Sequence, residues 1–200
     1  DDGYVIQWYR SAIPSNSLAC LYGLAKQCAE DKTLGPNVTL DIHAFDETNS
    51  VIKTRDIVRL IESADRGLVM LVGVQSNQFP RALDMARPLR EKGIQVAVGG
   101  FHVSGTIAML EERDPDVQKA LDMGVTIFAG EAEGRLEQVL KDAFHRDLQP
   151  IYNFMDDLPS LDDAYVSTSG LRNWARPALA RVLDSPCTIR TWGDGYGYFL

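Results

Sequence analysis

Short apolar runs alternate with amphipathic stretches along most of the chain. The runs are rich in β-branched and aromatic residues, a composition that favours strands. They occupy the ranges 4–9, 38–45, 67–73, 94–98 and 125–128. Apolar residues at helical spacing follow each run. The pattern therefore predicts five strand–helix units in series.

The predicted helices differ in how clearly they begin. They cover residues 17–31, 54–64, 80–92, 106–113, 116–123 and 131–144. Ser15 or Asn16 can cap the first helix, and Pro80 suits the first turn of the third. Among the strands, 38–45 alternates apolar and polar residues, which is typical of an edge strand. In contrast, 67–73 is apolar throughout, which is typical of a central strand covered on both faces.

Alternating strands and helices indicate the fold class. Crossover helices between successive strands produce a parallel sheet with helices packed on its faces. We predict an open, doubly wound α/β domain, Rossmann-like or flavodoxin-like, with a five-stranded parallel sheet and helices on both faces. Residues 1–150 form this domain in our interpretation. Residues 151–200 are interpreted as a linker or as the truncated start of a further domain.

Charge and hydropathy narrow the classes of partner. The formal net charge is −8, and the basic residues are scattered, which argues against nucleic acid. No apolar run approaches the roughly 18 residues that span a bilayer, and the chain opens with two aspartates instead of a signal-peptide pattern. We expect a cytoplasmic protein that binds no membrane. The cysteines, Cys20, Cys28 and Cys187, indicate neither a disulfide framework nor a zinc site.

The candidate binding residues follow the predicted strands, because ligands of doubly wound folds bind outside the carboxyl ends of the strands. They supply hydroxyl, amide or imidazole groups, or glycines that let a large ligand approach the backbone. They are Ser15 and Asn16 after the first strand, Gln75, Ser76 and Asn77 after the third, Gly99, Gly100, Phe101, His102 and Val103 after the fourth, and Gly130 and Glu131 after the fifth. Several also have a structural alternative, such as a turn, a helix cap or, for His102, a bond to a backbone group that fixes the loop.

Taken in order, these motifs resemble a known family. Ser76 and the Gly99–Gly100 pair match the Ser and Gly-Gly elements of cobalamin-binding domains at nearly the family's spacing. The segments 96–105 (VAVGGFHVSG) and 127–134 (IFAGEAEG) resemble the "GGxH" and "GE-x-E" loops of B12-dependent radical SAM enzymes. The resemblance is to the N-terminal cobalamin-binding domain of that family, and it covers about residues 4–158.

The resemblance implies a corrinoid ligand. A base-off cobalamin would lie across the carboxyl edge of the sheet, its nucleotide tail passing Ser76 and finding room at Gly99 and Gly100. In complete enzymes of the family, a following radical SAM domain carries a [4Fe-4S] cluster on a Cys-x3-Cys-x2-Cys motif and cleaves S-adenosylmethionine. Methylcobalamin often serves there in methyl transfer. This chain has no such motif, so we expect no catalytic residue, no metal ligand and no radical chemistry from it alone.

One departure leaves an alternative open. Most other B12 carriers place Asp-x-His-x-x-Gly after the first strand, and its histidine ligates cobalt. Residues 10–16 contain no histidine here, which fits the radical SAM branch. The alternative is a vestigial B12-like domain that acts as a structural or interaction module without a corrinoid. The loops lack the aspartates of a receiver and the Gly-x-Gly-x-x-Gly of a dinucleotide-binding fold, and they only half supply the phosphate loop of a flavodoxin.

Overall fold

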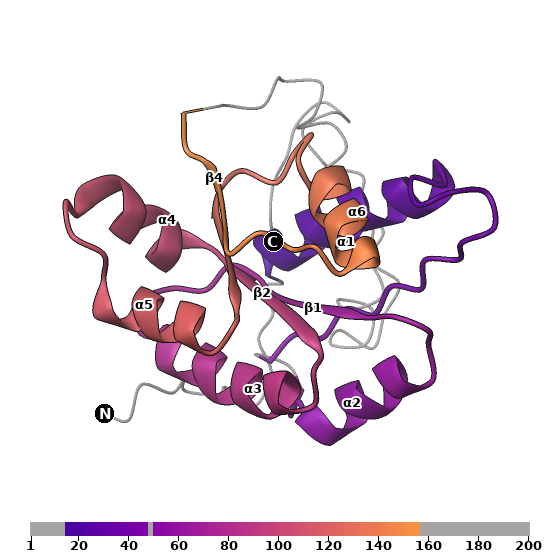
Figure 1. Cartoon of the computed structure of the whole chain (residues 1–200), viewed down its shortest axis with the longest axis horizontal. Coiled ribbons are helices and arrows are strands. Elements are labelled where there is room, and N and C mark those ends of the chain that lie inside the picture. Colours follow the sequence, from indigo (N-terminus) through magenta and orange to yellow (C-terminus); the bar gives the residue numbers. More distant parts are fainter. Residues whose placement is uncertain (1–14, 48–49, 157–200) are drawn as a thin grey trace, which may run out of the picture. The chain divides into compact units, whose positions relative to one another are not determined.

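The computed structural model describes residues 15–47 and 50–156, drawn in colour in Figure 1. These residues belong to two compact units, which are described separately. The first contains residues 51–131 and 138–156 and holds the whole sheet. The second contains residues 15–47, 50 and 132–137.

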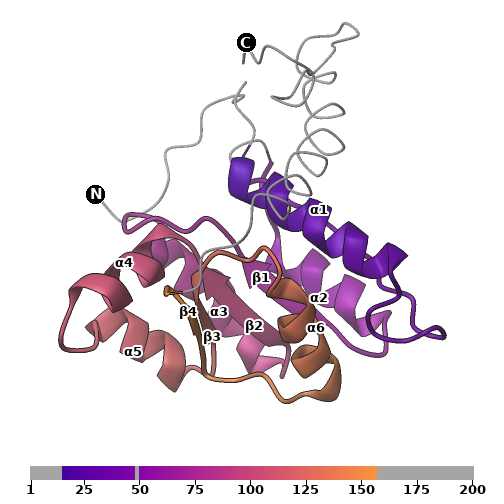
Figure 2. The ribbon, with the colours of Figure 1, turned by 90° about the horizontal axis from the view of Figure 1, so that it is seen from above.

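A parallel four-stranded sheet forms the first unit. Its strands are β1 (Leu68–Leu71), β2 (Gln95–Gly99), β3 (Thr126–Gly130) and β4 (Ile151–Phe154). They lie side by side in the order β1-β2-β3-β4 (Figures 1 and 2), and every neighbouring pair is parallel. The carboxyl ends of all four strands therefore lie at one edge of the sheet, as the sequence predicts for a ligand-binding edge.

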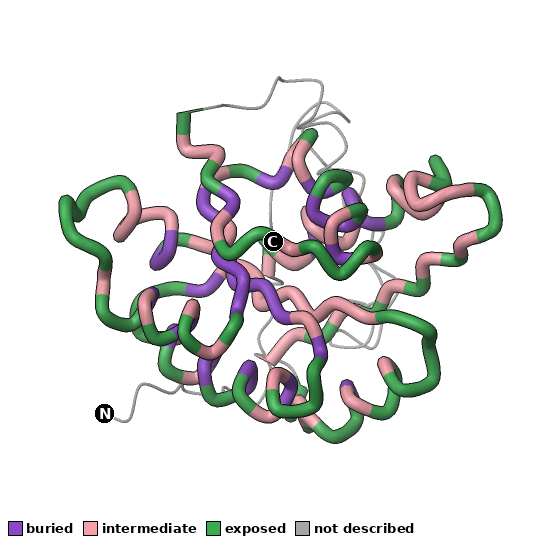
Figure 3. The backbone as a smooth tube through the Cα atoms, viewed as in Figure 1, coloured by how far each residue is buried: buried purple, intermediate pink, exposed green. Residues whose placement is uncertain are grey.

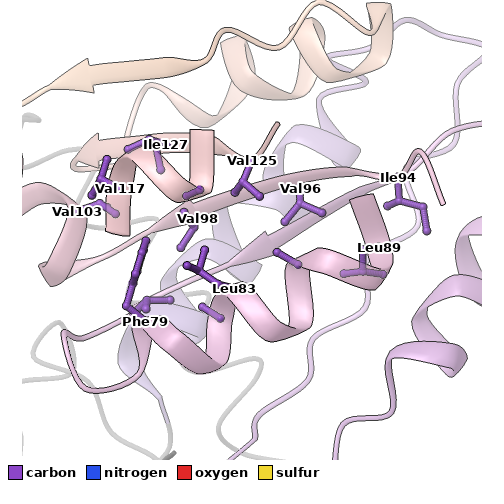
Figure 4. Close-up of a cluster of buried hydrophobic side chains, with 14 of the residues drawn as sticks. Phe79, Leu83, Leu89, Ile94, Val96, Val98, Val103, Val117, Val125 and Ile127 are labelled. Carbon is purple, nitrogen blue, oxygen red and sulfur yellow. The ribbon is translucent and has the colours of Figure 1, made fainter. Parts of the chain in front are cut away.

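The main apolar core lies on one face of this sheet. Val98 of β2 stands beside Ile127 of β3 in the register, and both side chains are almost completely buried. They join one apolar cluster with α3 (Phe79–Glu91) and α5 (Pro115–Asp122), shown in Figure 4. In Figure 3 buried positions follow β2 and β3 and recur along α3 and α5. This cluster is the main core of the unit.

The last helix, α6 (Leu136–His145), lies over the opposite face. Gln95 and Tyr152 point away from the Val98 side, since side chains alternate along a strand. Gln95 Nε2 donates to the Ala143 carbonyl at 2.8 Å, and the Tyr152 hydroxyl donates to Asp142 at 2.5 Å. The sheet therefore carries helices on both faces, which confirms the α/β class and that part of the prediction.

The predicted strand over 38–45 is wrong. The exposure of its residues does alternate, with Val38, Leu40, Ile42 and Ala44 half-buried and their neighbours exposed. However, 38–45 pairs with no strand among the described residues and is irregular. A strand needs a hydrogen-bonded partner, which an alternating pattern alone does not supply. The predicted strand over 4–9 lies outside the described residues, so four strands are described and not five.

Two further differences concern the ends of the sheet. β1 was expected to be central, but among the described strands it pairs only with β2, and all its residues are partly exposed. At the other end, β4 was not predicted at all. It pairs with β3 from Ile151 to Phe154, so the sheet extends past residue 150.

Two predicted helices begin at the wrong residue. The helix expected at 106–113 is α4 (Phe101–Met109), whose first turn occupies the predicted loop. The helix expected from Glu131 is α6, which begins at Leu136. The remaining helices, α1 (Asn16–Glu30), α2 (Thr54–Glu62), α3 and α5, follow the predicted ranges within about two residues. Within 15–47 and 50–156, none of the helices has the length and apolar character needed to cross a membrane.

Candidate functional site

Backbone hydrogen bonds join the carboxyl ends of β1 and β2. The Val74 N–H, just after β1, donates to the Gly99 carbonyl at 3.1 Å. The His102 N–H, in the first turn of α4, donates back to the Val74 carbonyl at 3.1 Å. Val74 therefore bonds the end of β2 through its N–H and the start of α4 through its carbonyl, which fixes the loop after β1 against both.

A side chain joins the end of β3 to the same edge. The Gly130 N–H, at the last residue of β3, donates to Ser104 Oγ at 3.1 Å. Ser104 lies one turn into α4, so this helix contacts the strand ends on both sides of β2. The structure thus brings together the predicted loops after β1, β2 and β3 as one connected edge.

His102 and Ser76 form the central polar contact of this edge. Their side chains come from different loops, and Nδ1 of His102 lies 3.2 Å from Oγ of Ser76. The His102 side chain is only 9% exposed, and its ring packs on Phe79 with 4.3 Å between ring centroids. Ser76 is exposed. The structural alternative for His102 was a bond to a backbone group, whereas the observed bond of its ring is to the Ser76 side chain.

Two of the predicted glycines are required by contacts within the chain. Gly100 has a φ of +138°, and a Cβ built there would lie 2.3 Å from the Val74 nitrogen. Gly130 has a φ of +106°, and a Cβ there would lie 2.8 Å from the Phe154 carbonyl carbon. Both positions therefore need glycine because backbones approach each other closely. Gly99 is less tightly enclosed, since its added Cβ would lie 3.2 Å from the Phe128 carbonyl oxygen.

The remaining predicted residues differ in exposure. Gln75, Asn77 and Glu131 are exposed, as is Phe101 with three quarters of its surface. In contrast, Val103 is fully buried in the core cluster. The exposed groups can reach a ligand, whereas Val103 packs α4, the helix that begins with Phe101, against the core.

Ser15 and Asn16 belong to the second unit. Ser15 is the N-cap of α1, and its side chain accepts a hydrogen bond from the Leu18 N–H at 3.3 Å. This confirms the predicted capping role. Asn16 is the exposed first residue of α1, and a ligand contact of either residue stays a prediction.

The described cysteines, Cys20 and Cys28, both lie half-buried on α1, and neither is part of a disulfide. Burial raises the pKa of the Cys28 thiol, and its hydrogen bond with Thr33 acts in the opposite direction. Across residues 15–47 and 50–156, no three or more His, Cys, Asp or Glu side chains are grouped so that they could hold a metal ion.

Three residues important to this edge were not among the predicted ones: Val74, Phe79 and Ser104. Val74 forms backbone hydrogen bonds with Gly99 and with His102, Phe79 packs on the imidazole, and Ser104 accepts from the Gly130 N–H. Ser104 stood inside the 96–105 motif, so its position in that motif was an available signal. The roles of Val74 and Phe79 depend on contacts between distant segments, which spacing along the chain does not reveal.

The groups at this edge fit the polar rim of a cobalamin. Exposed amide and hydroxyl groups of Gln75, Ser76 and Asn77 can bond the amide and phosphate groups that a corrinoid carries. Gly100 and Gly130 do not add space for it, because backbone of the chain already lies against them. The fit therefore rests on the side chains after β1 and on the imidazole behind them.

Comparisons with family models, with curated proteins and with solved structures found no match to this chain.

Proposed function

We propose that this chain is the cobalamin-binding domain of a B12-dependent radical SAM enzyme, built as a Rossmann-like, doubly wound domain in the cytoplasm. The observation that carries the proposal is the Ser76–His102 pair at the carboxyl edge of a parallel sheet. These two residues belong to two of the motifs on which the family resemblance rests. Their contact places both motifs at one edge, where ligands of such sheets bind.

The neighbouring residues supply the remaining polar groups of the proposed site. Gln75 and Asn77 flank Ser76 and are exposed, as is Glu131 after β3. We assign them to the amide side chains of the corrin rim and to the nucleotide tail. In the complete enzyme, the bound corrinoid would supply a carrier for a methyl group, and the radical SAM domain with its [4Fe-4S] cluster and S-adenosylmethionine would be the partner.

A second candidate function is a vestigial domain without a corrinoid. The observation favouring it is that Gly100, one of the two glycines expected to give the nucleotide tail room, already lies against the Val74 backbone. Such a domain would act as a structural or interaction module. The two candidates differ in one measurable property, the retention of cobalamin.

Variants of Ser76 test the proposal. We expect Ser76→Ala to weaken hydroxocobalamin binding about three- to tenfold in equilibrium dialysis, since one hydrogen bond to the ligand is lost. The matched control is Ser63→Ala, which removes a serine hydroxyl at the end of α2, where it donates to the Leu60 carbonyl. If both variants bind like the parent, Ser76 does not contact the ligand and the proposed site is wrong.

A further inference from the structure

The two ring nitrogens of His102 have different surroundings. Nδ1 lies 3.2 Å from Ser76 Oγ. Nε2 is buried and has no hydrogen-bond partner within the described part of the chain. The ring lies against Phe79, and the next residue, Val103, is fully buried. The Nε2 side of the imidazole is therefore enclosed, and only the Nδ1 side reaches a polar group.

This asymmetry selects one form of the neutral ring. A neutral imidazole carries one proton, so one nitrogen donates and the other accepts. A proton on Nε2 would leave a buried N–H without an acceptor, and orphaned buried N–H groups are rarer in proteins than acceptors that lack a donor. A proton on Nδ1 instead forms a hydrogen bond to Ser76.

We infer that His102 is a positioning residue that holds its proton on Nδ1 and donates it to Ser76 Oγ. The Ser76 oxygen is then engaged as an acceptor, so its own O–H is directed away from the imidazole. Because Ser76 is exposed, this O–H is presented at the carboxyl edge. The Ser76 hydroxyl therefore favours a ligand group that accepts a hydrogen bond, such as a phosphate oxygen or an amide carbonyl.

The inference deepens the proposed function and rests on it for the identity of the ligand. The tautomer itself depends only on the free protein. The His102 ring itself is assigned no ligand contact, because within the described residues its Nδ1 bonds Ser76 and its Nε2 is buried. In the reverse tautomer, Ser76 would donate its O–H to Nδ1. Its oxygen could then only accept from the ligand, so the site would favour a hydrogen-bond donor on the ligand instead of an acceptor.

Nitrogen-15 NMR of the ligand-free chain tests the tautomer directly. The chain has three histidines, and the signals of His102 are those lost in His102→Asn. We expect an Nδ1-protonated, Nε2-unprotonated ring, with an Nδ1 proton that exchanges slowly. In Ser76→Ala this proton should exchange too fast to detect. A signal from protonated Nε2, or an Nδ1 proton unaffected by Ser76→Ala, overturns the inference.

Ligand binding then tests the consequence for Ser76. His102→Phe keeps a ring but removes the donor, and we expect it to weaken hydroxocobalamin binding about three- to tenfold. His102→Asn can place an amide N–H near the Nδ1 position and should recover most of this loss. Equal binding by His102→Phe and the parent overturns the positioning role. If the parent binds no cobalamin while NMR shows the expected tautomer, the proposed function fails and the tautomer stands.

Discussion

At the scale of single residues, Gly100 belongs to the candidate site and is also required by the backbone packing of the fold. Its φ of +138° and its contact with the Val74 backbone both exclude a side chain. We predict that Gly100→Ala lowers the free energy of unfolding by about 2–4 kcal/mol, measured by urea denaturation with circular dichroism.

Gly105 provides the matched control for this prediction. It lies in α4, and nothing stands within 4 Å of the Cβ that alanine would add. Gly105→Ala should leave stability unchanged or raise it by up to about 1 kcal/mol, because alanine favours the helix. Equal stability of the Gly100→Ala variant and the parent would show that the backbone contact at Gly100 is not made.

The environment of Tyr152 predicts how the stability of the fold changes at alkaline pH. Its burial, together with the hydrogen bond to Asp142, raises the pKa of its hydroxyl from 10.0 to about 12. Between these values the folded state binds more protons than the unfolded state, so stability falls as the pH rises from 10.0 to about 12. Tyr152→Phe should remove this part of the slope, as measured by urea denaturation across that range. An identical slope in both proteins would contradict the raised pKa.

At the scale of elements, the beginning of α5 depends on one side chain. Asp114 accepts hydrogen bonds from the Asp116 N–H at 2.9 Å and the Val117 N–H at 3.2 Å. We predict that Asp114→Ala lowers the free energy of unfolding by about 1 kcal/mol, as for other N-cap residues. Glu112→Ala, at a nearby exposed position, should change it by less than about 0.5 kcal/mol. Similar losses in both variants would argue against a specific cap.

The elements that could be predicted from sequence are those whose signals are local. β2 and β3 are apolar runs, and α3 and α5 have helical periodicity and a proline in the first turn. In contrast, β4 is a strand because β3 lies beside it, and 38–45 has no such partner among the described residues. The presence of a partner strand depends on residues far away in the sequence, so the local pattern does not predict it. The start of α4 was missed because Gly99, Gly100 and Gly105 suggested a loop, whereas Gly100 alone makes the turn and Gly105 is helical.

At the scale of the whole molecule, sequence reasoning identified the strand ends but not their contacts. The strand-end rule identified the loops containing Ser76, His102 and Gly130, and the structure joins these loops at one edge. It did not anticipate that Gly100 would lie against Val74, because that contact joins segments 26 residues apart (100 − 74). The described part of the site is therefore a polar edge held by hydrogen bonds between different loops, and the sequence of one loop alone does not predict such bonds.

The most direct test of the proposed function is whether this chain retains cobalamin. The chain is incubated with hydroxocobalamin and desalted, and its visible absorption spectrum is recorded. The proposal predicts corrinoid bands that remain with the protein at one equivalent per chain. A colourless protein with the circular dichroism of a folded α/β domain would contradict it and favour the vestigial alternative.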